Sequence, residues 1–109
     1  MLLAIDVGNT NMVFGIYEGE ELKGSFRLQT DANRTSDEMG LLMCQYFQRF
    51  GVSLDQLEDV VIGSVVPQIM HTLSNAVKKY LGKEPLVIDE DLDPRLPYIP
   101  CDSDERLGP

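Results

Sequence analysis

Three apolar runs separated by short polar turns fill the first 28 residues, and they restrict the fold more than any other feature of the sequence. Residues 2–5 (LLAI) with Val7 form the first run, which is typical of a buried strand. Residues 12–17 (MVFGIY) form the second, after a turn rich in Gly and Asn. The third run alternates with polar residues and places on one face Leu22, Gly24, Phe26 and Leu28. The pattern predicts an antiparallel meander whose third strand has one face in water.

Two helices and two further strands are expected after the meander. Residues 35–38 (TSDE) predict a capping box, in which the Thr35 and Glu38 side chains bond each other's backbone N–H groups. The helix behind it ends at Gly51 and carries apolar residues at helical spacing: Met39, Leu42, Met43, Tyr46, Phe47 and Phe50. Residues 60–62 read as a short buried strand. Pro67 suits the first turn of a second helix, which ends at Gly82 and has an apolar stripe of Ile69, Leu73, Ala76, Val77 and Tyr80. Residues 86–88 are the last expected strand.

The resulting order, βββαβαβ, predicts an α/β fold with a mixed sheet and helices on its faces. This is the order of a ribonuclease-H-like, or actin-like ATPase, half-domain. We expect residues 1–88 to form one nucleotide-phosphate-binding domain. Residues 89–109 differ, because they hold four of the six prolines and seven of the 18 acidic side chains. Such a segment is expected to be extended and to lead toward a second domain.

Charge and composition exclude several classes of partner. The formal net charge of −9 makes a nucleic-acid backbone an unsuitable partner, since phosphate contacts along a duplex need Lys and Arg. The N-terminus has no basic region and reaches Asp6 almost at once, so neither a signal peptide nor a membrane span is expected, and a cytoplasmic location follows by default. Cys44 and Cys101 lack metal-ligand spacing and are expected to be free thiols, although a disulfide between them stays open.

Candidate chemistry lies in the first turn, residues 6–11 (DVGNTN). Gly8 is expected to let the backbone approach an anion and to adopt torsions that a Cβ would forbid. The Asn9 amide, the Thr10 hydroxyl and the backbone N–H groups of the turn are neutral donors for phosphate oxygens. Asp6 would repel a phosphate, so its expected role is to hold Mg²⁺ that bridges to the phosphates. An ordinary hairpin turn is the competing interpretation.

Other polar residues have simpler interpretations. His71 lies one position off the apolar stripe of the second helix and has no evident catalytic partner, so a surface role is expected. Arg34 either orients a loop near the phosphates or is solvated. Asp89, Glu90 and Asp91 lack the loop pattern of a calcium site and are expected to form a solvated turn. Ser64 lies in a strand-to-helix turn that is not a nucleophile elbow.

Several segments together resemble type III pantothenate kinases. Residues 1–17 (MLLAIDVGNTNMVFGIY) are similar to the opening of that family and keep its Asp-x-Gly-Asn-Thr-Asn phosphate motif. Residues 26–31 (FRLQTD) and 33–38 (NRTSDE) resemble its approach to the first helix, and residues 63–67 (GSVVP) resemble its Ser-Val-Val-Pro turn. The similarity runs through residues 1–88 in order and spacing.

The resemblance implies a kinase of two actin-like domains, of which this chain is roughly the first. The implied reaction is transfer of the ATP γ-phosphoryl group to the 4′-hydroxyl of pantothenate, which begins coenzyme A synthesis, in a homodimer that needs Mg²⁺ and a monovalent cation, K⁺ or NH₄⁺. By carry-over, the ATP phosphates would be lined by Asp6, Val7, Gly8, Asn9, Thr10, Asn11, Met12 and Val13, with Asp6 toward the metal.

The resemblance also implies which parts of the machinery this chain does not carry. Residues 107–109 (LGP) look like the start of the family's Gly-Ala-Asp-Arg-like motif, so Gly108 and Pro109 would contact substrate and the general-base Asp would follow Pro109. Cys101 aligns near a tyrosine of the substrate pocket, and Tyr98 is out of register with it. We therefore expect the chain alone to be inactive. A non-catalytic nucleotide-binding regulator of the same fold and another actin-like phosphotransferase remain alternatives.

Overall fold

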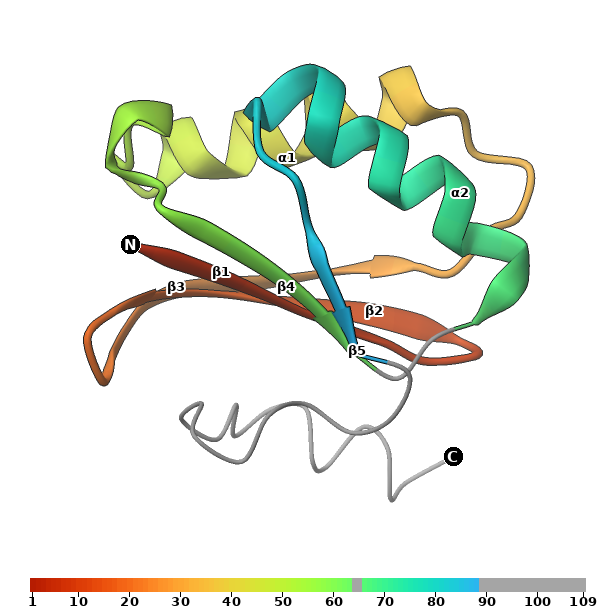
Figure 1. Cartoon of the computed structure of the whole chain (residues 1–109), viewed down its shortest axis with the longest axis horizontal. Helices are drawn as coiled ribbons and strands as arrows, with labels where there is room; N and C mark the ends of the chain where they lie inside the picture. The colour runs from red at the N-terminus through yellow and green to blue at the C-terminus, as the bar shows by residue number, and fades with distance from the viewer. Residues whose placement is uncertain (64–65, 89–109) are drawn as a thin grey trace.

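The computed structural model of the chain describes residues 1–63 and 66–88 and shows one five-stranded mixed sheet with two helices packed on it (Figure 1). The elements are β1 (Leu2–Val7), β2 (Asn11–Glu18), β3 (Glu21–Gln29), α1 (Ser36–Arg49), β4 (Asp59–Gly63), α2 (Pro67–Ala76) and β5 (Leu86–Ile88). A 3₁₀ turn, Leu54–Gln56, precedes β4, and a π-helical turn, Val77–Leu81, extends α2. The predicted order βββαβαβ is confirmed.

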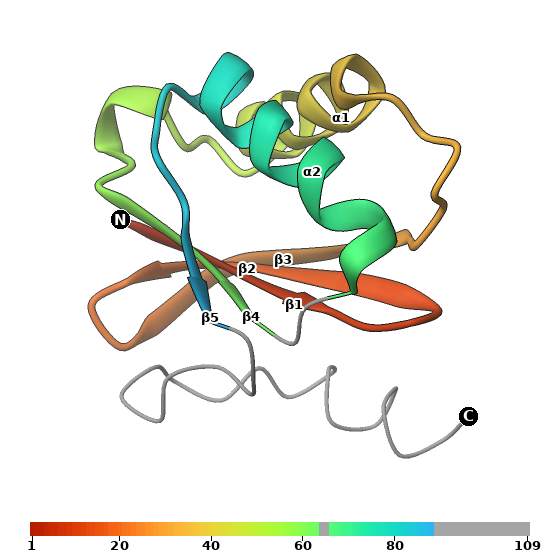
Figure 2. The same ribbon diagram turned by 45° about the vertical axis from the view of Figure 1, so that its right-hand side comes forward.

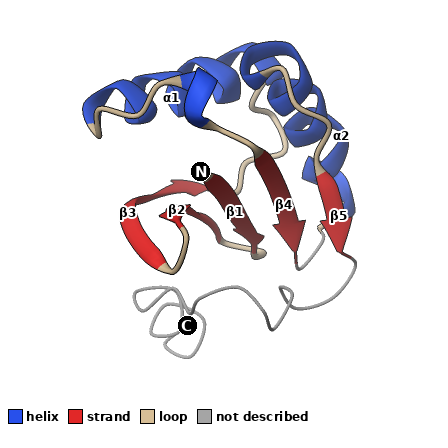
Figure 3. Cartoon of the chain, turned by 60° about the vertical axis from the view of Figure 1, so that its left-hand side comes forward, coloured by secondary structure: helices blue, strands red, loops and turns tan. Residues whose placement is uncertain are grey.

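The strands lie in the order β3-β2-β1-β4-β5. The first three form the predicted antiparallel meander, and β4 pairs in parallel with both β1 and β5. Both described helices cover the same face of the sheet, as the three views show (Figures 1, 2 and 3). The reason is topological: the β3–α1–β4 and β4–α2–β5 crossovers move across the sheet in the same direction, and right-handed crossovers then place both helices on one side.

The main core lies between that face and the helices. It takes alternate residues of the central strands, such as Leu3, Ile5 and Phe14, and the inner side chains of both helices, such as Met43 and Leu73. Stacked rings connect sheet and helix: the Phe26 ring lies 4.5 Å from that of Phe14 and 4.1 Å from that of Tyr46. This stacking fixes the position of α1 over the meander.

The third strand departs from the expected alternation. Leu22 was expected on the face of Phe26 and Leu28, and this prediction is wrong. The β2–β3 register shifts between Ile16 and Tyr17, so that Ile16 pairs with Gly24 and Tyr17 with Leu22. The extra residue turns Leu22 to the opposite face, where it packs against the buried group of Ala4, Val13 and Tyr17.

The helix boundaries follow the signals in the sequence. The Thr35–Glu38 capping box is present, Pro67 lies in the first turn of α2, and Gly51 and Gly82 adopt positive φ at the two C-terminal ends. Ile69, Leu73, Ala76 and Val77 are buried as expected. None of the described helices is both long and apolar enough to cross a bilayer.

Candidate functional site

Asp6 is the one polar residue in the buried part of the described sheet, with 2% of its surface exposed. It lies in the central strand β1, where it pairs with Val13 of β2 on one side and with Gly63 of β4 on the other. Paired residues point to the same face, so Asp6 lies on the face opposite the two helices. A carboxylate is rarely buried unless it is paired, hydrogen-bonded or bound to a metal, and its place at the carboxyl end of β1, directly before the turn, makes Asp6 a candidate site residue.

The turn after Asp6 is closed by hydrogen bonds from two directions. The Gly8 N–H donates to the Asn11 carbonyl at 2.9 Å, within the turn itself. Thr30, directly after β3, supplies two more: its N–H donates to the Thr10 carbonyl at 2.8 Å and its hydroxyl donates to the Gly8 carbonyl at 2.8 Å. The turn is therefore fixed to the neighbouring strand end.

The expectation that Gly8 needs torsions forbidden to other residues is wrong. The glycines with positive φ in the described residues are Gly19, Gly51 and Gly82. Glycine at position 8 is explained by close approach instead, because a Cβ there would lie 3.0 Å from the Asn11 carbonyl oxygen. With a larger residue, the Asn11 carbonyl that accepts the Gly8 hydrogen bond would have to shift.

The residues predicted to line the phosphates divide into two groups. Asn9 and Thr10 are exposed, and Gly8 and Asn11 are partly exposed, so this turn presents polar groups to solvent. Val7, Met12 and Val13 are buried, with at most 3% of their surface exposed. The side chains of these three residues are therefore closed to a ligand, and their backbones are paired in the sheet.

The loop between β3 and α1 lies next to this turn. Within it, the Arg34 N–H donates to the Asp31 carbonyl at 3.1 Å, and the Arg34 Nη2 donates to the Gln29 carbonyl at 3.3 Å. Arg34 is half-buried rather than fully solvated. Its guanidinium thus braces the end of β3, from which Thr30 reaches the turn.

The start of α2 lies at the same end of the sheet as the β1–β2 turn (Figures 1 and 2). Its N-cap, Val66, makes no side-chain capping bond. The carboxyl ends of the parallel strands β1 and β4 also meet here, through the pairing of Asp6 with Gly63. This is the edge of an α/β sheet at which ligands characteristically bind, and the helix N-terminus adds partial positive charge.

Asp6 fits a magnesium ion. Within the described ranges, 1–63 and 66–88, no group of three or more His, Cys, Asp or Glu side chains is arranged to hold a metal. Mg²⁺ does not require one, because it commonly binds through one or two carboxylates, water and substrate phosphates. A single buried carboxylate matches that donor set if the N–H groups of the neighbouring turn hold the phosphates that supply the other oxygen ligands.

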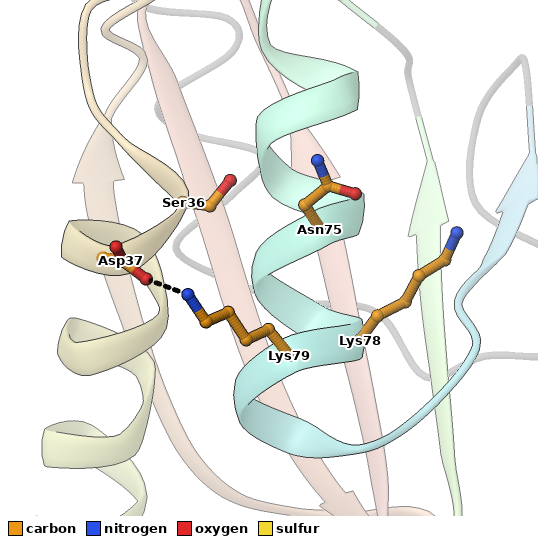
Figure 4. A pocket seen from close by; sticks show the side chains of 5 residues that line it. All are labelled: Ser36, Asp37, Asn75, Lys78 and Lys79. Carbon is orange, nitrogen blue, oxygen red and sulfur yellow. Dashed lines mark hydrogen bonds and ion pairs between the residues drawn. The ribbon is translucent and has the colours of Figure 1, made fainter.

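A hollow of about 470 Å³, the α1–α2 hollow, lies between the start of α1 and the end of α2, away from the turn. Figure 4 shows the side chains that line it, which are Ser36, Asp37, Asn75, Lys78 and Lys79. Its two lysines have acidic partners: Lys79 Nζ lies 2.9 Å from Asp37 Oδ1, and Lys78 Nζ lies 3.4 Å from Glu84 Oε1. Asp37 repels an anion from the α1 N-terminus, so this hollow is a poor phosphate site.

Asp37 makes stability at the helix pair dependent on pH. Hydrogen bonding from the Tyr80 hydroxyl at 2.6 Å, and then from Lys79, lowers the pKa of Asp37 below its ordinary value of 3.8. The same bond raises the pKa of Tyr80 above its ordinary value of 10.0. The Asp37 contribution is complete above pH 3.8 and is lost as pH falls through the lower folded pKa. The Tyr80 contribution is complete below pH 10.0 and is lost as pH rises through the higher folded pKa.

We therefore expect the difference in melting temperature between the parent chain and Asp37→Asn to depend on pH. The parent's advantage should be largest from about pH 5 to 9 and should shrink below about pH 4 and above about pH 10. Scanning calorimetry of both proteins at matched ionic strength measures it. A difference that stays constant from pH 2.5 to 11 would show that the Asp37 charge does not contribute.

The remaining sequence candidates take the following places. His71 is exposed on α2, where its Nε2 lies 3.1 Å from the Asn75 amide, in line with the surface role expected for it. Cys44 is a free thiol, and partial burial raises its pKa. Ser64, Asp89, Glu90, Asp91, Tyr98, Cys101, Gly108 and Pro109 lie outside the described residues. Sequence reasoning did not assign a role to Thr30, because nothing in the sequence shows that the end of β3 reaches this turn.

Comparison of the sequence with known proteins identifies its family. The family model of type III pantothenate kinase matches residues 2–108. A relative from Finegoldia magna, named type III pantothenate kinase, is 47% identical over 92 residues, which are 84% of this chain and 35% of that protein. Another of the same name, from Geobacter sulfurreducens, is 44% identical over 108 residues, which are 99% of this chain and 42% of that protein.

Solved structures support the fold. A Bacteroides thetaiotaomicron protein with an actin-like ATPase fold superimposes with a TM-score of 0.61 at 9% identity, over 84% of this chain and 34% of the other. The ROK hexokinase of Thermus thermophilus gives a TM-score of 0.59 at 14% identity, over 80% and 34%. The half-domain therefore has the predicted actin-like architecture. The chain spans less than half the length of the curated relatives it matches, and it belongs to the type III pantothenate kinase family.

Proposed function

We propose that the protein to which this chain belongs transfers the γ-phosphoryl group of ATP to the 4′-hydroxyl of pantothenate, the first step of coenzyme A synthesis. Membership of the family over residues 2–108 supports the reaction. The observation that carries the assignment to this chain is the buried Asp6 carboxylate, at the carboxyl end of β1 and directly before a turn with exposed polar groups.

In this proposal residues 6–13 hold the ATP phosphates. The backbone N–H groups of the turn and the side chains of Asn9 and Thr10 donate to phosphate oxygens. Asp6 binds Mg²⁺, which supplies charge neutralisation of the phosphates when bound. The buried residues Val7, Met12 and Val13 anchor both ends of the turn in the sheet, so that its donors are held in place before ATP arrives.

The rest of the machinery would come from outside the described residues. The family resemblance assigns pantothenate contacts to Gly108 and Pro109 and the general base to an aspartate that follows Pro109. We also propose that the complete protein is a homodimer that uses a monovalent cation, K⁺ or NH₄⁺. Because these parts are needed together, we expect the 109 residues alone to show no kinase turnover.

The test uses a joined protein, in which residues 1–109 are followed by the part of the Geobacter sulfurreducens relative that lies beyond the matched region. ADP release is measured with ATP, Mg²⁺, K⁺ and pantothenate, with the unaltered relative as the positive control. The proposal predicts pantothenate-dependent ADP release from the joined protein and none from the 109-residue chain. ADP release that appears only when another alcohol replaces pantothenate as the acceptor would point to another phosphotransferase. Mg·ATP binding without any turnover would favour the regulatory alternative.

A further inference from the structure

Thr30 lies outside the candidate phosphate turn and makes two hydrogen bonds to it. It follows the last residue of β3, and it is half-buried. Both of its polar donors are directed at the turn: the hydroxyl donates to the Gly8 carbonyl and the backbone N–H donates to the Thr10 carbonyl, each at 2.8 Å. One residue therefore fixes two of the turn's carbonyls from the same side.

Because a peptide group is planar, holding its carbonyl also sets the direction of the next residue's N–H. In a trans, planar peptide the C=O and the next residue's N–H point in opposite directions. Because Thr30 holds the Gly8 and Thr10 carbonyls, the N–H groups of Asn9 and Asn11 are directed away from Thr30. Asn9 is exposed and Asn11 is partly exposed, so both residues are in contact with solvent. Backbone N–H groups that point to one side of a turn can together bind an anion.

We propose that Thr30 is a positioning residue for ATP: its hydroxyl orients the Gly8–Asn9 peptide so that the Asn9 N–H faces the bound phosphates. The inference rests on the proposed function, because it concerns the same site. The two bonds of Thr30 have different consequences. The bond from its N–H continues the β2–β3 pairing and survives any substitution except proline. The bond from its hydroxyl depends on the side chain, so a substitution can remove it alone.

The test compares variants of the joined protein defined above. Thr30→Val keeps the β-branched shape and removes the hydroxyl, and Thr30→Ser keeps the hydroxyl. Ser36→Ala is the matched control, because the Ser36 hydroxyl donates to the Thr72 carbonyl at 3.0 Å in a half-buried setting at the start of α1. It removes the same kind of hydrogen bond at a place away from the turn. Figure 4 shows Ser36 at the α1–α2 hollow.

Thr30→Val is expected to raise the KM for ATP about 10-fold, the size of effect given by losing one hydrogen bond that orients a binding group. The KM for pantothenate should stay unchanged, Thr30→Ser should recover most of the ATP affinity, and Ser36→Ala should behave as the parent. Circular dichroism confirms that each variant is folded.

Three results would overturn the inference. If the parent turns over and Thr30→Val has an unchanged KM for ATP, Thr30 does not position the turn. If Thr30→Val raises both KM values equally, or Ser36→Ala matches it, the effect is a general loss of structure. If the parent joined protein neither binds nor uses ATP, the proposed function fails, and this inference fails with it.

Discussion

Asp6→Asn is expected to lower kcat/KM for Mg·ATP about 100- to 1,000-fold in the joined protein, while the fold is retained. The loss is large because a metal that neutralises phosphate charge contributes several kcal/mol to transition-state stabilisation. The amide has nearly the same shape as the carboxylate, so packing around this buried position should change little. Steady-state kinetics with Mg²⁺ varied at fixed ATP measures the effect, and the apparent Mg²⁺ requirement should rise together with the loss of rate.

Asp59→Asn is the matched control for this experiment. Asp59 is an exposed carboxylate at the first residue of β4, paired with Leu2 at the opposite end of the same β1–β4 ladder. The substitution is chemically identical and lies on the neighbouring strand, but at an exposed position far from the turn. We expect parent-like kinetics for Asp59→Asn. Equal losses in the two variants would mean that net charge, rather than a metal at Asp6, determines the rate.

Gly40→Ala is expected to destabilise the chain by about 2 kcal/mol, although alanine favours a helix over glycine by about 1 kcal/mol. Gly40 is buried on α1, and a Cβ there would overlap Cδ1 and Cγ of the Tyr80 ring. The whole ring would have to move, and its hydroxyl is bonded to Asp37 at 2.6 Å. The free energy of unfolding from urea titration of the 109-residue chain measures the cost.

Two further variants show whether overpacking causes the loss of stability in Gly40→Ala. In a Tyr80→Ala background the cost of Gly40→Ala should disappear, because the clashing ring is gone and only the helix preference remains. Leu41→Ala, at the next residue of α1, is the control at an exposed position, since 55% of Leu41 is accessible. A Gly40→Ala chain as stable as the parent would show that the helices can separate without loss and that the Gly40–Tyr80 contact does not determine their spacing.

The sequence predicted the elements well because each carries a local physical signal. The capping box at Thr35–Glu38 and the proline at residue 67 act within a single turn of helix, so they can be recognised without knowing the fold. The face of Leu22 could not be predicted in this way. It depends on a register shift opposite Ile16 and Tyr17, which belongs to the pairing of two strands and not to either strand alone.

In the candidate site, too, the local features could be predicted from the sequence and the long-range contacts could not. Residues 6–11 were recognisable because Asp, Gly and Asn after a buried strand form a local pattern. The role of Thr30 depends on a contact across 22 residues, and the reason for glycine at position 8 depends on its distance to Asn11. Both required the structure, because chain separation says nothing about which strand end reaches a turn.

The most direct test of the central claim, that the β1–β2 turn binds the nucleotide phosphates, is paramagnetic broadening by Mn·ATP. Manganese replaces magnesium at oxygen ligands and broadens the NMR signals of nearby amides. We predict that, in the ¹⁵N-labelled 109-residue chain, broadening is centred on the amides of Asp6, Gly8 and Asn9. Broadening centred instead on Ser36 and Lys79 at the α1–α2 hollow, or no selective broadening at the turn, would contradict the claim.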